Sequence, residues 1–158
     1  MNWFKRKKES NEAKVLSLLT SDELNEMGNL PSIAICATFE GKLAKPINFK
    51  VNKAFVYFMH QTISKKAPSL QSIKKSAVEQ GDGYIYIIDF RTPEGIIGNV
   101  PSEDIIGAFK VADGKIVANS YRGNDKHQVF TKNGLVKFPP GLDKILIEEI
   151  KNAGNEMH

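Results

Sequence analysis

Two hairpin signals in the second half of the chain constrain its fold more than any other feature. The dipeptides Asp113-Gly114 and Asn133-Gly134 each separate two short apolar runs. A two-residue type I′ turn requires positive φ at both central positions, which Asn, Asp and Gly tolerate best. Two such turns close together in the sequence predict an antiparallel meander.

The run that precedes these hairpins, residues 84–90, carries apolar or aromatic side chains on both faces of an extended chain. A strand that is buried on both sides has this pattern. We therefore predict a central strand with helices packed on at least one of its faces. Asp89 and Arg91 are two positions apart, so they should share a face at the end of this strand.

Helical patterns flank the β-rich half on both sides. Before it, residues 10–19 carry an apolar stripe, Thr20 to Glu23 form a capping-box pattern, and Asn52 is a suitable N-cap for a helix ending near Lys66. A further helix is expected from Pro68 to Gly81, with an inward stripe of Leu70, Ile73, Ala77 and Val78. After the β-rich half, a terminal helix is expected, with the stripe Leu142, Ile145, Leu146 and Ile150.

These patterns predict a single α+β domain over residues 10–151. Its sheet should be mostly antiparallel, with about five to seven strands and with helices before and after the β-rich half. Residues 1–9 are expected to form a flexible basic tail that folding does not need. Residues 152–158 are expected to fray.

The positive charge of the chain is concentrated at its start. The sequence has 22 Lys and Arg against 18 Asp and Glu, and residues 5–8 (Lys-Arg-Lys-Lys) account for the whole excess of four. A neutral body argues against nucleic-acid binding along the domain. Trp3 and Phe4 beside the basic cluster leave weak contact of the tail with a membrane surface or with nucleic acid open.

The sequence predicts a cytoplasmic protein. It has no apolar run of transmembrane length, and charged residues follow the basic start where a secretory signal would be apolar. Its one cysteine, Cys36, excludes an intrachain disulfide and is expected to be a buried apolar residue.

No catalytic residue, cofactor site or metal site is predicted. His60, His127 and Cys36 show no metal-ligand spacing, and a Cys–His nucleophile pair has no support in the sequence. The glycine-containing segments match neither GxGxxG nor GxxxxGK[ST], so they do not indicate nucleotide binding.

The predicted partner-binding residues lie on the connections between strands. Thr92-Pro93-Glu94-Gly95 has the composition of a turn, Ser102 is expected to cap a helical turn, and residues 120–126 form a polar loop. Loops on a rigid sheet commonly carry recognition, and their acids would meet a basic partner surface. The residues are Asp89, Arg91, Glu94, Glu103, Asp104, Tyr121 and Arg122. Two alternatives stay open: a structural ion pair of Asp89 with Arg91, and an acidic cluster for acid–base chemistry or a hard cation.

One segment carries a family resemblance. Ile85-Tyr86-Ile87-Ile88, followed by residues 100–109 (Val-Pro-Ser-Glu-Asp-Ile-Ile-Gly-Ala-Phe), resembles the closing segment of cholera-toxin-like ADP-ribosyltransferase domains in bacterial polymorphic toxins. That family's catalytic arginine strand, Ser-Thr-Ser element and Glu-x-Glu motif have no counterparts here, which argues against transferase activity. The short format with a basic aromatic start is similar to that of small bacterial immunity proteins from toxin loci.

The leading functional hypothesis is a non-enzymatic bacterial protein that binds another protein, with a toxin-neutralising immunity protein as its specific form. An enzyme with an acidic site around Asp89 is the alternative from another class. A nucleic-acid or membrane-surface binder acting through the tail is a further alternative. Fold or format does not by itself decide among them.

Overall fold

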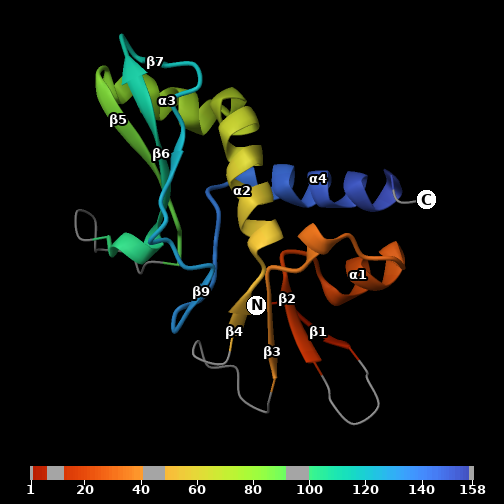
Figure 1. Ribbon diagram of the computed structural model, residues 1–158. Coiled ribbons are helices and arrows are strands. Elements are labelled where there is room, and N and C mark those ends of the chain that lie inside the picture. Colours follow the sequence, from red (N-terminus) through yellow and green to blue (C-terminus); the bar gives the residue numbers. More distant parts are fainter. Residues whose placement is uncertain (1, 7–12, 41–48, 92–99, 157–158) are drawn as a thin grey trace. The chain divides into compact units, whose positions relative to one another are not determined.

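The computed structural model describes residues 2–6, 13–40, 49–91 and 100–156 (Figure 1). The chain is α+β with antiparallel strand pairing, as predicted. It divides into two compact units: residues 1–58, 129–135 and 146–158, and residues 59–128 and 136–145. The expected strands are distributed over separate small sheets and do not form one sheet. In the described part of the chain, no helix is both long enough and apolar enough to cross a membrane.

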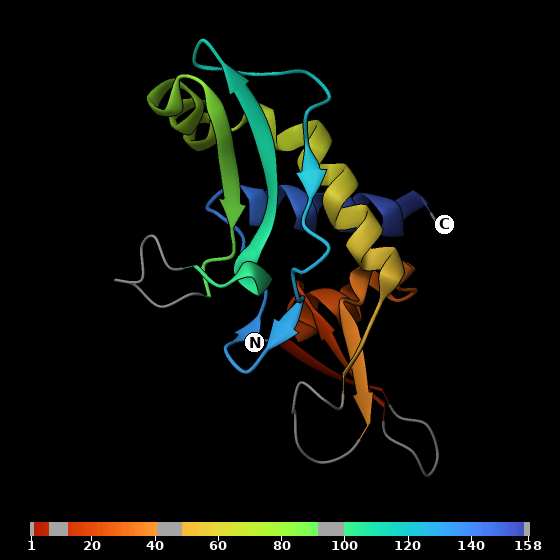
Figure 2. The same cartoon turned by 60° about the vertical axis from the view of Figure 1, so that its left-hand side comes forward.

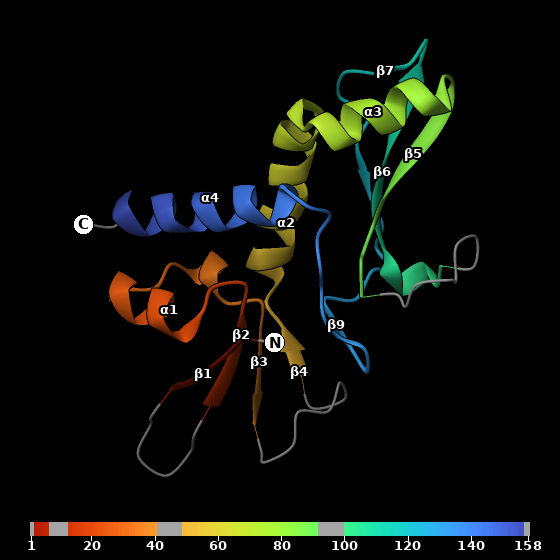
Figure 3. The same cartoon turned by 180° about the vertical axis from the view of Figure 1, so that it is seen from behind.

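The first unit contains an antiparallel sheet in the order β1-β2-β3-β4 (Figure 3). Its strands are β1 (Asn2–Arg6), β2 (Ala13–Ser17), β3 (Ala37–Glu40) and β4 (Phe49–Val51). A hairpin of β9 (Phe130–Thr131) and β10 (Gly134–Leu135) belongs to the same unit. The ring of Phe49 stacks between those of Phe39 and Phe130, with centroid distances of 4.8 Å and 4.0 Å.

The start of the chain corrects two predictions. Residues 2–6, expected in a flexible tail, pair with β2, and the helix expected over residues 10–19 is replaced by β2 itself. Val15 and Leu16 are neighbours and are both buried, so β2 is buried on both faces between β1 and β3. A short apolar run of this kind cannot be distinguished from a helical stripe by its spacing.

Helix α1 (Ser21–Met27) confirms the predicted capping box. The Glu23 backbone N–H donates to the Thr20 hydroxyl oxygen at 3.2 Å, and the Thr20 N–H donates to a Glu23 carboxylate oxygen at 3.0 Å. The first unit's core lies beside this helix and consists of buried Leu19, Leu24, Ala34 and Ile150, with partly buried Leu18, Met27, Leu30, Ile33, Phe58 and Ile147 around them.

Two longer helices begin as the sequence predicts. In α2 (Lys53–Lys66), the side-chain oxygen of Asn52 accepts the Ala54 N–H at 3.1 Å. Helix α4 (Leu142–Glu156) buries Leu142, Leu146 and Ile150. It continues to Glu156 through residues that were expected to fray, and buried Gly154 lies close to Met27.

The second unit contains the sheet on which the candidate site is built (Figure 2). Strand β6 (Ile105–Ala112) pairs with β5 (Gly83–Ile88) on one side and with β7 (Lys115–Ile116) and β8 (Arg122–Gly123) on the other. The type I′ turn between β6 and β7 is confirmed, with φ of 51° at Asp113 and 71° at Gly114. The second predicted hairpin forms as β9–β10, but Gly134 is part of a strand and residues 132–133 make the turn.

The prediction that β5 is a central strand buried on both faces is wrong. It lies at the edge of its sheet and buries Ile85 and Ile87 on one face, while Tyr84 and Tyr86 are 53% and 58% exposed on the other. Tyrosine combines an apolar ring with a hydroxyl that water can solvate, so its presence did not require burial.

Helix α3 (Gln71–Gln80), preceded by the 3-10 helix η3 (Ala67–Ser69), lies along β5 and β7 (Figure 3). It buries Ile73 and Ala77 and ends at Gly81, as expected. Val78 was expected on the same inward stripe, but it is 68% exposed. The buried stripe is therefore narrower than the sequence suggested.

Replacing Thr20 by Ala should lower the free energy of unfolding by about 1 kcal/mol, because the Glu23 N–H would lose its acceptor at the start of α1. Urea denaturation measures this loss. Ser72→Ala, which removes an exposed hydroxyl from α3, is the control and should change stability much less. Equal effects of the two changes would contradict a capping role for Thr20.

Candidate functional site

The end of β5 directs alternate residues to opposite sides. The backbone N–H of Asp89 donates to the carbonyl oxygen of Asp104 at 2.7 Å, whereas the N–H of Phe90 donates to Lys137 O at 2.8 Å. The side chains alternate in the same way, since Asp89 and Arg91 are buried and Phe90 is exposed. The sequence correctly placed Asp89 and Arg91 on one face.

Asp89 is fully buried, and both of its carboxylate oxygens are engaged. Oδ1 accepts the backbone N–H groups of Arg91 at 3.1 Å and Lys137 at 2.9 Å. Oδ2 lies 2.9 Å from Arg91 Nη2 and 3.0 Å from His127 Nε2. The Asp89 carboxylate thus holds three groups in place: the end of its own strand, the backbone at Lys137 and the imidazole of His127.

Arg91 links Asp89 to the segments on either side of β6. Its Nε donates to Asp104 Oδ1 at 3.2 Å, in the 3-10 helix η4 (Ser102–Asp104). Its Nη2 donates to the carbonyl oxygens of Glu103, at 3.3 Å, and Gln128. We call Asp89, Arg91, Asp104 and His127 the charge network.

The geometry of the charge network suits a structural role better than catalysis. The side chains of Asp89, Arg91, Asp104 and His127 are at most 3% exposed. The guanidinium lies between the two carboxylates, where a bound cation would otherwise have to lie. Across the described residues, no group of three or more His, Cys, Asp or Glu side chains is placed to hold a metal ion, and no buried side-chain N or O atom lacks a partner.

A second feature is the exposed face of the same sheet. Tyr84 lies opposite Lys110, and Ala108 lies between Tyr86 and Arg122 in the strand register. Tyr84, Tyr86, Lys110 and Arg122 are all exposed, and we call them the aromatic–basic face. Strands β5, β6 and β8 lie side by side beneath it (Figure 2).

On the other face of β6, Tyr121 fills the space above Gly107. A Cβ atom at position 107 would overlap the Tyr121 ring, and the ring also contacts Phe109 at a centroid distance of 5.0 Å. The Tyr121 hydroxyl lies 2.6 Å from Nδ1 of His60. Burial raises the pKa of the Tyr121 hydroxyl and, together with the nearby His127, lowers the pKa of His60.

The structure separates the predicted partner-binding residues into different environments. Asp89, Arg91 and Asp104 are buried in the charge network, so their direct contact with a partner is corrected to internal pairing. Their mutual neutralisation is the physical reason for this burial. Glu94 lies outside the described residues.

The other three predicted residues differ in their exposure to solvent. Arg122 is exposed, whereas Glu103 and Tyr121 are half-buried. His127, Tyr84, Tyr86 and Lys110 were missed as site residues. The tyrosine alternation at positions 84 and 86 was visible in the sequence, but we interpreted it as burial. Cys36, predicted to be a buried apolar residue, is buried with its thiol pKa raised by that burial.

No family model matches this chain, and no match to it was found among curated proteins or solved structures. The resemblance of residues 84–109 to ADP-ribosyltransferase domains therefore stays a prediction.

Replacing Arg91 by Met should lower the free energy of unfolding by about 3–5 kcal/mol, because Asp89 and Asp104 would be buried without their cation. The double variant Asp89→Asn/Arg91→Met should cost less than the sum of the single changes. Urea denaturation measures each variant, with the exposed residue in Arg122→Met as control. Strict additivity of the two changes would rule out the pairing.

The free energy of unfolding should fall as the pH drops below about 6.5, the ordinary histidine value. The pKa of His60 is lowered in the folded chain, first by burial and then by His127, so the unfolded chain binds the proton more readily. This contribution is present above the unfolded pKa and is lost as the pH falls through the folded pKa. Thermal denaturation between pH 7.5 and 5 measures this, and the melting temperature of His60→Gln should fall less with pH than that of the wild-type chain. The same pH dependence in both proteins would contradict a contribution from His60.

Proposed function

We propose that this protein binds another protein and that the aromatic–basic face is its contact surface. The observation that carries the proposal is the pair of exposed tyrosines, Tyr84 and Tyr86, at alternate positions of one strand. Tyrosine and arginine are enriched where protein interfaces gain most of their binding free energy.

The setting of these tyrosines supports recognition. They lie on a strand that is paired with β6 along its length and anchored at its end by the charge network. The backbone of such a strand does not have to be ordered on binding, which removes one cost of association. Tyrosine adds to this advantage because it presents a large ring with few rotatable bonds.

The charge of the face indicates the chemistry of the partner. Lys110 and Arg122 are the charged residues of the aromatic–basic face, and both are basic. A partner surface with carboxylates beside apolar groups would complement it and would associate faster at low salt. This differs from the acidic contact edge that the sequence suggested, since Asp104 is buried and Glu103 is half-buried.

The charge network supports binding over catalysis. Both oxygens of Asp89, the residue around which an acidic active site was considered, accept hydrogen bonds within the chain. A general acid or base must reach the proton that it transfers. Asp89 is engaged and fully buried, so it does not offer that access.

The specific form of the proposal is a bacterial immunity protein that acts in the cytoplasm and has a toxin domain as its partner. Its support is the likeness of residues 84–109 to a segment found in toxin loci. A captured partner that arrests growth when it is expressed alone would establish this form.

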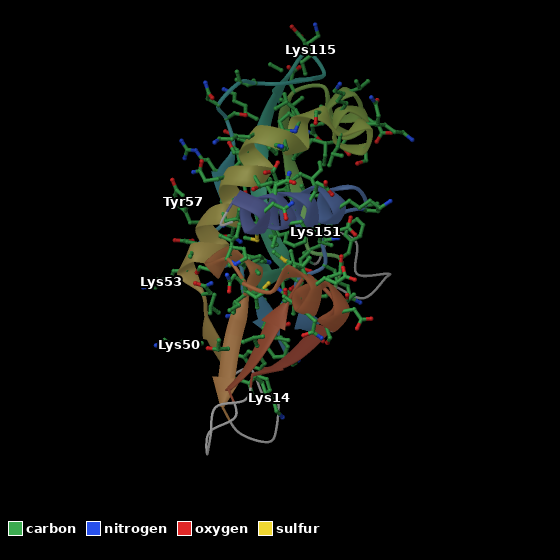
Figure 4. All side chains as sticks on the ribbon, turned by 90° about the vertical axis from the view of Figure 1, so that its right-hand side faces the viewer. Lys14, Lys50, Lys53, Tyr57, Lys115 and Lys151 are labelled. Atoms are coloured by element: carbon green, nitrogen blue, oxygen red, sulfur yellow. The ribbon has the colours of Figure 1, made fainter. Side chains whose placement is uncertain are left out.

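Site-specific photocrosslinking in the native cell tests the proposal. A photoreactive phenylalanine analogue at position 84 should give one discrete adduct with a different protein, separate in mass from any adduct with a second copy of this chain. The matched control is position 57 on α2, where the tyrosine is 69% exposed and points away from the helix (Figure 4). Arg122→Glu should reduce the adduct at position 84, because it reverses one charge of the aromatic–basic face.

Binding measurements with the purified partner then give the contribution of each tyrosine to the binding free energy. Tyr84→Ala and Tyr86→Ala should each weaken binding by at least about 2 kcal/mol, or roughly thirtyfold, if they are central contacts. Equal crosslinking at positions 57 and 84 would overturn the proposal. Tight binding of single-stranded DNA to the aromatic–basic face would replace it with nucleic-acid stacking.

A further inference from the structure

Among the described residues, no strand pairs with the edge of β5 that faces away from β6. The N–H of Asp89 is directed toward β6, because it donates to Asp104 O, whereas the N–H of Phe90 is directed away from β6, to Lys137 O. Hydrogen-bonding directions alternate along a strand, so the N–H and C=O groups of Tyr84, Tyr86 and Ile88 also point away from β6. Within the described residues, no hydrogen bond to these outward groups is found.

The pairing of β6 agrees with this assignment. Lys110 O accepts the N–H of Val117 on the far side of β6, so the neighbours of Lys110 are the residues that bond to β5. Phe109 and Val111 lie opposite Ile85 and Gly83. The odd-numbered residues of β5 therefore form the ladder with β6, and the even-numbered residues form the open edge.

Within the described residues, this edge has neither a charge nor a proline, and the shift in its pairing with β6 between Ile87 and Ile88 comes only at its end. Residues 83–88 read Gly-Tyr-Ile-Tyr-Ile-Ile, without a charge or a proline. Exposed edge strands in natural proteins are commonly protected by lysine, proline, a bulge or a covering segment. An uncharged, aromatic edge favours a partner strand of the same character.

We propose that β5 pairs antiparallel with β5 of a second copy of this chain, centred on Tyr86. In this register Tyr86 lies opposite Tyr86 of the second copy, and Tyr84 lies opposite Ile88. All the outward N–H and C=O groups of Tyr84, Tyr86 and Ile88 then find partners. The contact is isologous, as in most homodimers, because the same surface serves both copies.

The ends of the open edge fit this register in length. The N–H of Phe90 already donates to Lys137 O, so an added strand can extend only as far as Ile88. At the other end the chain turns where β5 begins, with φ of 75° at Gly81 and 114° at Gly83, the first residue of the strand. Each copy therefore offers a strand about as long as the edge that it would fill.

The charged residues near the ends of the open edge are also compatible with this register. Beyond the last paired residues, the register brings Asp82 of one copy near Phe90 and Lys137 of the other, and both Asp82 and Lys137 are exposed. Asp82 Oδ1 accepts the Asp113 N–H at 3.0 Å within its own chain, so Oδ2 is the oxygen that would meet the Lys137 ammonium group at each end of the contact. The Lys110 side chains of the two copies stay three strand spacings apart, about 14 Å, which exceeds the screening length of about 8 Å at physiological salt.

The dimer would join two aromatic–basic faces into one surface. Tyr84 and Tyr86 from both copies would lie at its centre, with Lys110 and Arg122 on either side. This inference goes beyond the proposed function, and its test needs only the purified chain. A failed dimer and a failed partner contact are therefore separate results.

Sedimentation equilibrium of the full chain should show a concentration-dependent rise toward twice the monomer mass. Tyr86→Lys and Tyr86→Glu should each be monomeric, because like charges would lie opposite each other at the centre of the contact. An equimolar mixture of the two variants should recover the dimer, since Lys then lies opposite Glu. Val78→Lys adds the same charge to an exposed apolar position of α3 and should leave the dimer unchanged.

A cysteine variant provides a second measurement that does not place a charge in the strand. Opposite residues of a hydrogen-bonded antiparallel pair have Cα atoms about 5.5 Å apart, within disulfide range. Tyr86→Cys should therefore form an intermolecular disulfide on mild oxidation, and Val78→Cys should not. The natural Cys36 is buried and would not interfere.

Three results would overturn the proposal. They are a wild-type chain that stays monomeric at every concentration, a mixture of Tyr86→Lys and Tyr86→Glu that stays monomeric, and equal crosslinking of Tyr86→Cys and Val78→Cys. Circular dichroism of each variant separates loss of the dimer from loss of the fold.

Discussion

The end of the second unit's sheet is held by the ion pairs and hydrogen bonds of the Arg91 guanidinium. This guanidinium lies 2.9 Å from Asp89 and 3.2 Å from Asp104, and it also donates to the carbonyl oxygens of Glu103 and Gln128. The regular pairing of β5 with β6 shifts between Ile87 and Ile88, directly before this group. The side-chain contacts of Arg91 therefore take over where the backbone ladder becomes irregular. Losing Arg91 would leave the carboxylates of Asp89 and Asp104 buried without their cation.

The buried network and the exposed face have a common origin in the alternation of an extended chain. From residue 84 to residue 91, the odd positions face inward, as Ile at 85 and 87 and as charged residues at 89 and 91. The even positions face outward and carry Tyr84, Tyr86 and Phe90 as exposed aromatics. The segment that anchors the sheet therefore also presents its recognition surface.

Local chemistry was predictable from the sequence, and long-range convergence was not. The Thr20 capping box, the Asn52 cap and the Asp113-Gly114 turn formed as expected, because each depends on residues within one turn of chain. The charge network joins Asp89 to His127, 38 positions away, and Arg91 to Asp104, 13 positions away, so only the folded topology brings them together. The helix predicted over residues 10–19 is the strand β2, and the burial predicted for both faces of β5 is wrong, because the spacing of a short apolar run reports neither the type of element nor how many of its sides are covered.

The close contact of Tyr121 with Gly107 has a consequence for how this sequence can diverge. A Cβ atom at position 107 would overlap the Tyr121 ring, and one at position 123 would lie 2.8 Å from the His60 ring. These four positions form a single steric unit, in which the two glycines provide the space that the two rings fill. Substitutions among relatives should therefore be correlated: lineages that retain both rings should retain both glycines, and an alanine at either glycine should be accompanied by a smaller side chain opposite it.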